Sequence, residues 1–214
     1  MQVGNAMMVL SEQLPRIFQA NLARLYERII EPAMDGLVVH PILEDGEARS
    51  MDEFLDRAGA QVDNYTSNEA AKSFVLTLAA VFERQLSSWA RAMGLVDLAK
   101  LRGFQEHLLA CANLASIDLA IGDLGTELTE IFTVANVVRH GEGASCERLR
   151  AMAPALWSDT ASDYVDLMPG PRLPSENLRI RRKDLVRYIR ATTRFWGRAD
   201  PLPMAVTDPL YWLS

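Results

Sequence analysis

Residues 66–94 carry the sequence TSNEAAKSFVLTLAAVFERQLSSWARAMG, which decides the fold class. Its large apolar side chains recur at the spacing of one helix face and not in strict alternation. They are Phe74, Leu78, Val81, Phe82, Leu86 and Trp89. Thr66 and Glu69 have the spacing of a capping box, in which each side chain accepts a hydrogen bond from a free amide of the first turn. Gly94 is suited to end a helix. We therefore predict a long buried helix from about Thr66 to Gly94.

Similar start and stop signals lie on both sides of this stretch. Ser11 is placed to cap a first helix, which Pro32 ends. Ser50 and Glu53 form another capping box, at the start of a short helix to about Val62. Further helices are expected at about 96–114, 126–140, 145–152 and 182–198, with a non-helical connector at 168–174. We predict an all-α fold, a bundle of long antiparallel helices with additional short helices, formed by residues 1–214 as a single domain.

The composition is that of an ordinary folded protein of 214 residues, with 49% apolar and 23% charged residues. The longest apolar run, at 74–82, is far shorter than the roughly 20 residues of a membrane-spanning helix. No basic residue precedes the short apolar stretch near the N-terminus, so no secretion signal is expected. Cys111 and Cys146 are too few for a disulfide framework. We expect a soluble protein of the reducing cytoplasm that does not enter a membrane.

The net charge of −6 hides a segregation of charge along the chain. Between Arg172 and Arg198 there are nine basic and two acidic residues, a balance of +7. The rest of the chain has 13 basic and 26 acidic residues, a balance of −13. The overall negative charge argues against a general nucleic-acid binder. The segregation itself bears on the partners of the protein and not on its fold.

The last predicted helix places its basic residues on one side. This basic stripe consists of Lys183, Arg187, Arg190, Arg194 and Arg198. One interpretation of the stripe is functional, as a binding surface for a nucleic-acid backbone or for an acidic partner protein. The alternative is that it is an outer face whose arginines pair with the acidic remainder of the same chain. Phe195 and Trp196, on the same helix, are interpreted as core anchors and not as a base-stacking platform.

Several common catalytic motifs are absent. The sequence contains no glycine-rich phosphate loop, no dinucleotide-binding fingerprint and no Gly-x-Ser-x-Gly elbow. His107 and Cys111 lie one helical turn apart and form half of a metal site, but the other two histidines have no Cys or His nearby. We therefore expect neither a metal nor a cofactor.

The segment Ala135-Asn-Val-Val-Arg-His-Gly141 is the strongest candidate for a functional site. The apolar residues of its helix, Leu128, Ile131, Ala135 and Val138, share one face. A polar stripe of Thr129, Thr133, Asn136 and His140 follows another face. An imidazole held by an amide one turn earlier is suited to general acid–base work. The alternative is that His140 only complements the helix dipole and binds carbonyls of the last turn.

A long helix that ends in Asn-x-x-x-His-Gly and follows other long helices resembles the HEPN superfamily, small all-α proteins of bacterial conflict systems. The resemblance extends loosely over residues 66–155. Many members are metal-independent endoribonucleases whose active site is shared across a homodimer, and their motif is an arginine, a polar residue and a histidine at short helical spacing. The resemblance assigns the histidine to His140 and the polar residue to Asn136. At the positions of the family's arginine this chain has Thr133, Val134 and Ala135, so Arg139 is the substitute.

The resemblance implies RNA cleavage that leaves a cyclic phosphate, in a defence or toxin-type system. His140 would act as the general acid or base, Asn136 would orient it and Arg139 would stabilise the phosphate charge. The alternative is a catalytically inactive HEPN-like module, in which this helix forms a homodimer or a regulatory-partner interface. A third hypothesis is a helical protein unrelated to the family that binds a small ligand between its helices.

Overall fold

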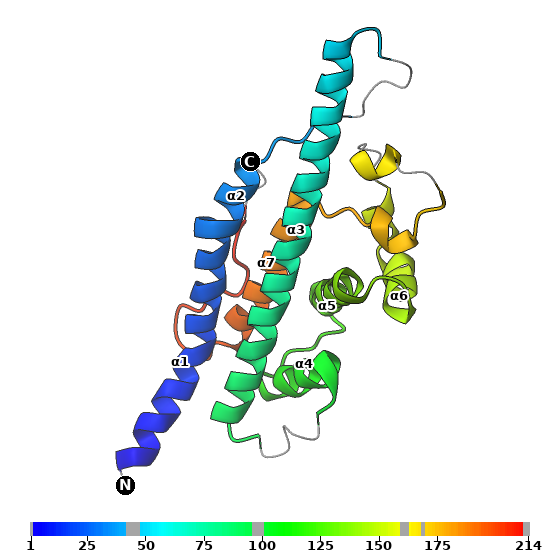
Figure 1. Cartoon of the computed structure of the whole chain (residues 1–214). Helices are drawn as coiled ribbons and strands as arrows, with labels where there is room; N and C mark the ends of the chain where they lie inside the picture. The colour runs from blue at the N-terminus through cyan, green and yellow to red at the C-terminus, as the bar shows by residue number, and fades with distance from the viewer. Residues whose placement is uncertain (1, 42–47, 96–100, 159–162, 168–169, 212–214) are drawn as a thin grey trace.

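The computed structural model describes residues 2–41, 48–95, 101–158, 163–167 and 170–211. The chain is all-α, and no strand occurs in these ranges. The long helices are α1 (Gln2–Leu25), α3 (Met51–Ala92), α5 (Leu124–His140) and α7 (Arg182–Ala199). The shorter elements are the π-helical turn η1 (Tyr26–Ile30), α2 (Glu31–Asp35), α4 (Gly103–Leu114), α6 (Ala144–Met152) and the 3-10 turns η3 (Pro154–Trp157), η4 (Tyr164–Leu167) and η5 (Pro174–Asn177). The predicted fold class, a bundle of long helices with additional short ones, is confirmed (Figure 1).

The longest helix, α3, runs through the middle of the bundle. The helices α1 and α2 lie along one side of it, and α4, α5 and α6 lie on the other (Figure 1). One ion pair joins Arg16, in the second half of α1, to Asp200 at the C-terminal cap of α7, and another joins Asp35 at the end of α2 to Arg182 at the start of α7. Two further pairs join the first half of α5 to α7 in the reverse order of sequence. Both α1 and α5 therefore run antiparallel to α7.

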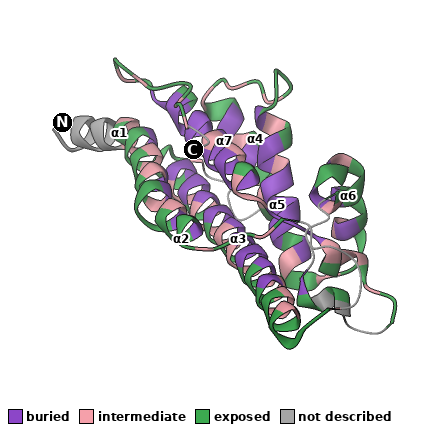
Figure 2. Ribbon diagram, turned by 90° about the horizontal axis from the view of Figure 1, so that it is seen from above, coloured by how far each residue is buried: buried purple, intermediate pink, exposed green. Residues whose placement is uncertain are grey.

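The basic helix α7 occupies the centre of the bundle, in contact with α1, α3 and α5. Thirteen of its 18 residues are buried, and Figure 2 shows it as a largely buried ribbon. Phe195 and Trp196 are fully enclosed, and the ring of Phe82 meets both of them edge to face at 5.4 and 5.8 Å. The prediction that these two aromatic residues anchor the core is confirmed. The cationic segment of the sequence is thus an interior element.

Residues 51–92 form one continuous helix, so the predicted break between Val62 and Thr66 is wrong. The first capping signal is confirmed, because the hydroxyl of Ser50 accepts a hydrogen bond from the amide of Glu53 at 3.1 Å. The second signal misleads because the polar residues beside it bind other segments of the chain. Asn64, for example, accepts a hydrogen bond from the backbone amide of His40 at 2.8 Å.

The buried amide of Asn68 joins α3 to the segment that leads into α7. Its Nδ2 donates to the carbonyl of Leu178 at 3.0 Å, and its Oδ1 accepts a hydrogen bond from the amide of Ile180 at 2.9 Å. The two bonds satisfy backbone groups of a segment that has no regular secondary structure of its own. A polar residue in the middle of a long helix therefore serves tertiary structure and not a helix start.

Replacement of Asn68 by alanine is expected to lower the free energy of unfolding by about 2–3 kcal/mol, because two buried backbone groups lose their partners. Urea denaturation followed by circular dichroism measures the change. Ser73→Ala on the exposed side of α3 is the control and is expected to stay within about 0.5 kcal/mol of the wild type. An Asn68→Ala effect as small as that of the control would contradict this role.

The N-terminal helix begins at Gln2 and not at Ser11. It also continues past Pro32, because α1, η1 and α2 follow one another to Asp35. Pro32 stands in the first turn of α2, directly after the π-helical turn η1, where the hydrogen-bonding register changes. The proline therefore does not end the helix.

The observed starts of α5, α6 and α7 lie within a few residues of the predicted starts at 126, 145 and 182. The expected start at Val96 lies outside the described residues, and α4 begins at Gly103 after two non-helical residues. Within the described ranges, no helix combines the length and the apolar content that a bilayer crossing requires.

Candidate functional site

The C-terminal end of α5 presents three polar side chains to solvent. Ten of the 17 residues of α5 are buried, because the helix packs against α3, α6 and α7. Asn136, Arg139 and His140 are exposed. Gly141 then ends the helix with a φ of 70°, a conformation that favours glycine. A mostly buried helix thus ends in an exposed imidazole, with an exposed amide one turn earlier.

These three side chains make no hydrogen bond or ion pair with any other residue that the structure describes. The two threonines of the same polar stripe are occupied, because Thr129 and Thr133 donate to carbonyls four residues earlier, at 2.8 Å each. Of the predicted polar stripe, only Asn136 and His140 are therefore available to a ligand or to a second chain.

The positions that the HEPN pattern gives to arginine are in the core. Thr133, Val134 and Ala135 are 5%, 0% and 1% exposed. A guanidinium at any of them would have to be buried, at a large cost in free energy unless it were paired. Arg139 is the exposed cation next to His140, and it is the residue of this helix end that can meet a phosphate.

A polar cavity of about 350 Å³ lies directly behind the end of α5 and reaches Gly141. Its wall on α3 includes Tyr65 and Lys72, and Tyr164 closes it from η4. The rings of Tyr65 and Tyr164 lie 4.3 Å apart, and their hydrogen bond raises the pKa of Tyr65 to about 12. Lys72 binds Glu69 at 2.7 Å. The cavity therefore holds phenols and a paired lysine beside the helix end that carries His140.

The basic stripe of α7 is largely neutralised within the chain. Arg187 makes two hydrogen bonds to the carboxylate of Glu130, at 2.8 and 2.5 Å. Arg194 binds Asp123 at 2.7 Å, and Arg190 binds Asp208 at 3.1 Å. The remaining two cations of the stripe, Lys183 and Arg198, are exposed and have no partner among the described residues. Three of the five residues therefore pair with the acidic remainder of the same chain.

The structure does not bring the basic stripe and the end of α5 together. The ion pairs of α7 lie along the first half of α5, at Asp123 and Glu130. His140 follows Glu130 by ten residues, which is about 15 Å of helix. The basic stripe lies away from His140 because α7 packs beside the first half of α5, where its arginines face Asp123 and Glu130. The α7 arginines therefore do not contribute to the surface at His140, where Arg139 is the neighbouring cation on α5.

One buried carboxyl, that of Glu127, was not singled out from the sequence. Glu127 is 8% exposed, its Oε2 is fully buried, and it has no hydrogen-bond partner in the described part of the chain. Burial, followed by repulsion from Asp123, raises its pKa to about 7, although Arg187 and Arg194 act in the opposite direction. The signal in the sequence is its position, one turn from Leu124 and Ile131 on the core face of α5.

Glu127→Gln is expected to stabilise the protein above neutral pH. The carboxyl titrates near 4.5 in the unfolded chain and near 7 in the folded protein, so the folded state holds more protons between these values. Stability therefore falls as the pH rises from about 4.5 to 7, by on the order of 2 kcal/mol, and glutamine removes this loss. Thermal unfolding of both proteins between pH 4 and 8 measures it. Equal melting temperatures at pH 8 would contradict a buried, uncompensated carboxyl.

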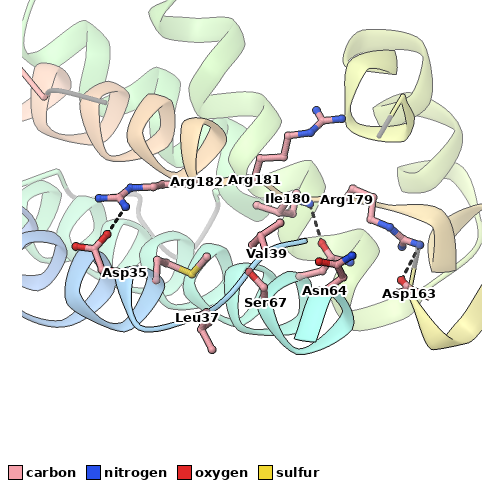
Figure 3. Close-up of a pocket in the computed structure, with 12 residues that line it drawn as sticks. Asp35, Leu37, Val39, Asn64, Ser67, Asp163, Arg179, Ile180, Arg181 and Arg182 are labelled. Carbon is pink, nitrogen blue, oxygen red and sulfur yellow. Dashed lines mark hydrogen bonds and ion pairs between the residues drawn. The ribbon is translucent and has the colours of Figure 1, made fainter. Parts of the chain in front are cut away.

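A second cavity, of about 420 Å³, lies between α2, α3 and residues 179–182 (Figure 3). Arg179 binds Asp163 at 2.7 Å on one side of it, and Arg182 binds Asp35 on the other. Figure 3 shows Arg179, in the segment before α7, paired with Asp163, and Arg182, at the start of α7, paired with Asp35 of α2. Because these four charges are paired, we interpret the cavity as a junction between elements.

His107 and Cys111, the half of a metal site in the sequence, face different surroundings. The Nδ1 of His107 lies 3.0 Å from the carbonyl of Gly103. Cys111 is fully buried, and burial raises the pKa of its thiol to about 12. Among the residues that the structure describes, no group of three or more His, Cys, Asp and Glu side chains is placed to hold a metal ion.

Comparison with protein-family models, with curated proteins and with solved structures finds no match to this chain.

Proposed function

We propose that this chain is a HEPN-like helical protein of a bacterial defence or toxin-type system that cleaves RNA without a metal at the end of α5. The observation that carries the proposal is the exposure of Asn136, Arg139 and His140, without internal partners, on a helix that is otherwise buried. Exposed polar groups on a rigid, well-packed element are suited to bind and position a substrate.

In this proposal His140 accepts the proton of a ribose 2′-hydroxyl, whose oxygen attacks the adjacent phosphorus. The bond from phosphorus to the 5′-oxygen breaks, and that oxygen takes a proton from a second imidazole that is in its protonated form, which leaves a 2′,3′-cyclic phosphate, a 5′-hydroxyl and a neutral second imidazole. A homodimer that brings two copies of His140 together supplies the base and the acid. Asn136, which makes no hydrogen bond to His140 in the structure, is proposed to orient the ring once RNA is bound, and Arg139 stabilises the charge that develops on the phosphate.

The test is the purified protein with fluorescently labelled single-stranded RNA, with and without EDTA. The expected result is cleavage at the same rate in both conditions, with 2′,3′-cyclic phosphate ends on the products. RNA that stays intact, or cleavage that EDTA abolishes, would contradict the proposal. Light scattering during size exclusion determines whether the active species contains two chains.

A second candidate is a non-catalytic HEPN-like module that binds itself or a regulatory protein through the same helix end. The internal pairing of Arg187, Arg190 and Arg194 and the buried residues at the family's arginine positions favour it, because these three arginines bind carboxylates of the chain and the family's arginine is absent. For this candidate, replacing Arg139 and His140 together by alanine is expected to change the oligomeric state while wild-type protein leaves RNA intact.

A further inference from the structure

A cleft of about 640 Å³ lies between the first half of α5, the start of α7 and the segment from α6 into η3. Its volume is within the range of small-ligand sites. The wall from Met152 to Leu156 is apolar, and Val186 and Tyr211 extend it. The ionisable residues that line it are Glu127, Glu130, Arg181, Lys183, Asp184, Arg187 and Arg190. The cleft therefore has one apolar wall and one strongly polar wall.

Two groups of this cleft are not used by the fold. Arg187 and Arg190 bind carboxylates of the chain. In contrast, the carboxyl of Glu127 and the ammonium of Lys183 have no partner within the described ranges. Burying the carboxyl of Glu127 without a hydrogen bond costs folding free energy. A leucine at this position would not carry that cost. An uncompensated polar group at the wall of a cleft is typical of a ligand contact.

The two unused groups stand at opposite parts of the polar wall. Arg190 is one of the cations that act on Glu127, and Lys183 precedes Arg190 by seven residues on α7. This is about 10 Å of helix. A ligand that engages both groups therefore has a hydrogen-bonding edge at one end, an anion at the other and an apolar body between them.

We propose that this cleft binds a nucleoside monophosphate, with its base edge at the carboxyl of Glu127 and its phosphate at Lys183. A carboxyl that is partly neutral near pH 7 can both donate and accept a hydrogen bond, and a base edge carries groups of both kinds. The wall from Met152 to Leu156 gives the flat ring an apolar surface. Lysine is a common phosphate ligand. The site is independent of RNA cleavage, because His140 follows Glu127 by thirteen residues, about 20 Å along α5.

The pH dependence of binding follows from the groups around Glu127. On α5 the facing charge is Asp123, whose pKa is lowered by its hydrogen bond from Arg194, and on α7 the facing charges are Arg187, Arg190 and Arg194. The segment from α6 into η3 contributes apolar residues. With its pKa raised to about 7, Glu127 is the carboxyl of this group that we expect to change its charge between pH 6 and 8.5. We expect the affinity to fall as the pH rises through about 7.

Isothermal titration calorimetry of the full chain with adenosine monophosphate tests the proposal, with adenosine and inorganic phosphate as separate probes. Wild type is expected to bind the nucleotide at least about tenfold more tightly than either fragment. Glu127→Ala and Lys183→Ala are each expected to weaken binding by about tenfold or more. Arg198→Ala, an exposed cation at the other end of α7, is the matched control for Lys183 and is expected to leave binding unchanged.

Glu127→Gln keeps a donor and an acceptor in place, so this variant is expected to bind the nucleotide. Its affinity is expected to lack the part of the wild-type pH dependence that comes from the carboxyl of Glu127. The ionisation of the phosphate affects both proteins equally and cancels in the comparison. The proposal is overturned if the wild type does not bind the nucleotide, if either fragment binds as tightly, or if Glu127→Ala and Lys183→Ala bind like the wild type. RNA cleavage is expected to be unchanged in Glu127→Ala, which separates this test from that of the proposed function.

Discussion

RNA cleavage by the His140→Ala variant is expected to be at least about 100-fold slower than cleavage by the wild type. A positioned general acid or base contributes about 10²- to 10⁴-fold to a rate, and the proposed reaction has no metal to take over this role. Because the His140 side chain is exposed and has no partner in the described structure, its removal is expected to change the free energy of unfolding by no more than about 0.5 kcal/mol. Initial cleavage rates and urea denaturation measure the two quantities on the same samples.

His107→Ala is the matched control for this variant. It removes the same side chain from α4, where the ring lies against the carbonyl of Gly103 and away from the end of α5. Its cleavage rate is expected to equal that of the wild type. If His140→Ala retains the wild-type rate, or if His107→Ala loses activity to the same extent, His140 is not the catalytic group.

Gly197→Ala is expected to lower the free energy of unfolding by about 3 kcal/mol, at the upper end of the common range for overpacked sites. A Cβ at this position would lie 1.9 Å from the carbonyl oxygen of Val206 and 2.6 Å from the Nε2 of Gln19. The same Gln19 amide donates to the carbonyls of Thr193 and Val206, at 2.9 and 2.7 Å. The atom nearest to the added Cβ is therefore the backbone oxygen of Val206, which the hydrogen bond from Gln19 holds in place. This backbone cannot move aside as the end of a flexible side chain would.

Gly59→Ala is the matched control, because it makes the same change inside a long helix where a Cβ meets nothing within 4 Å. Alanine is favoured over glycine in helices by about 1 kcal/mol, so this variant is expected to be more stable than the wild type. Urea denaturation of both variants measures the opposite signs. A gain in stability for Gly197→Ala would contradict the close approach of α1, α7 and the C-terminal segment at this point.

Capping and stop signals in the sequence predicted helix ends correctly where the residue acts only on the backbone next to it. Ser50 caps α3 and Gly141 ends α5, because both roles depend on the neighbouring backbone alone. The predicted break near Thr66 is wrong because the polar residues there bind segments far away in the sequence, as Asn68 binds Leu178 and Ile180. No periodicity in one helix indicates such a partner.

In the candidate site, too, the sequence predicted the features that depend on one helix and missed those that depend on packing between helices. The sequence indicated that Asn136 and His140 share a face of α5, and their surface is exposed in the structure. It did not determine whether the arginines of α7 meet solvent or carboxylates of the same chain, because that depends on the packing of α7 beside α5. Glu127 lies at a core position of an amphipathic helix, which the sequence pattern shows, but the absence of a hydrogen-bond partner for its Oε2 among the described residues depends on the same packing.

The central position of α7 also has a consequence for how the chain reaches its native state. The contacts between α1 and α7 join residues that are at least 157 positions apart, since α1 ends at Leu25 and α7 begins at Arg182, so the core closes through pairings that are distant in the sequence. Folds dominated by such distant pairings form slowly. During synthesis α1, α3 and α5 leave the ribosome before the helix that covers them, and their apolar faces stay open until residues 182–199 emerge. We expect chains halted before that point to bind chaperones or aggregate.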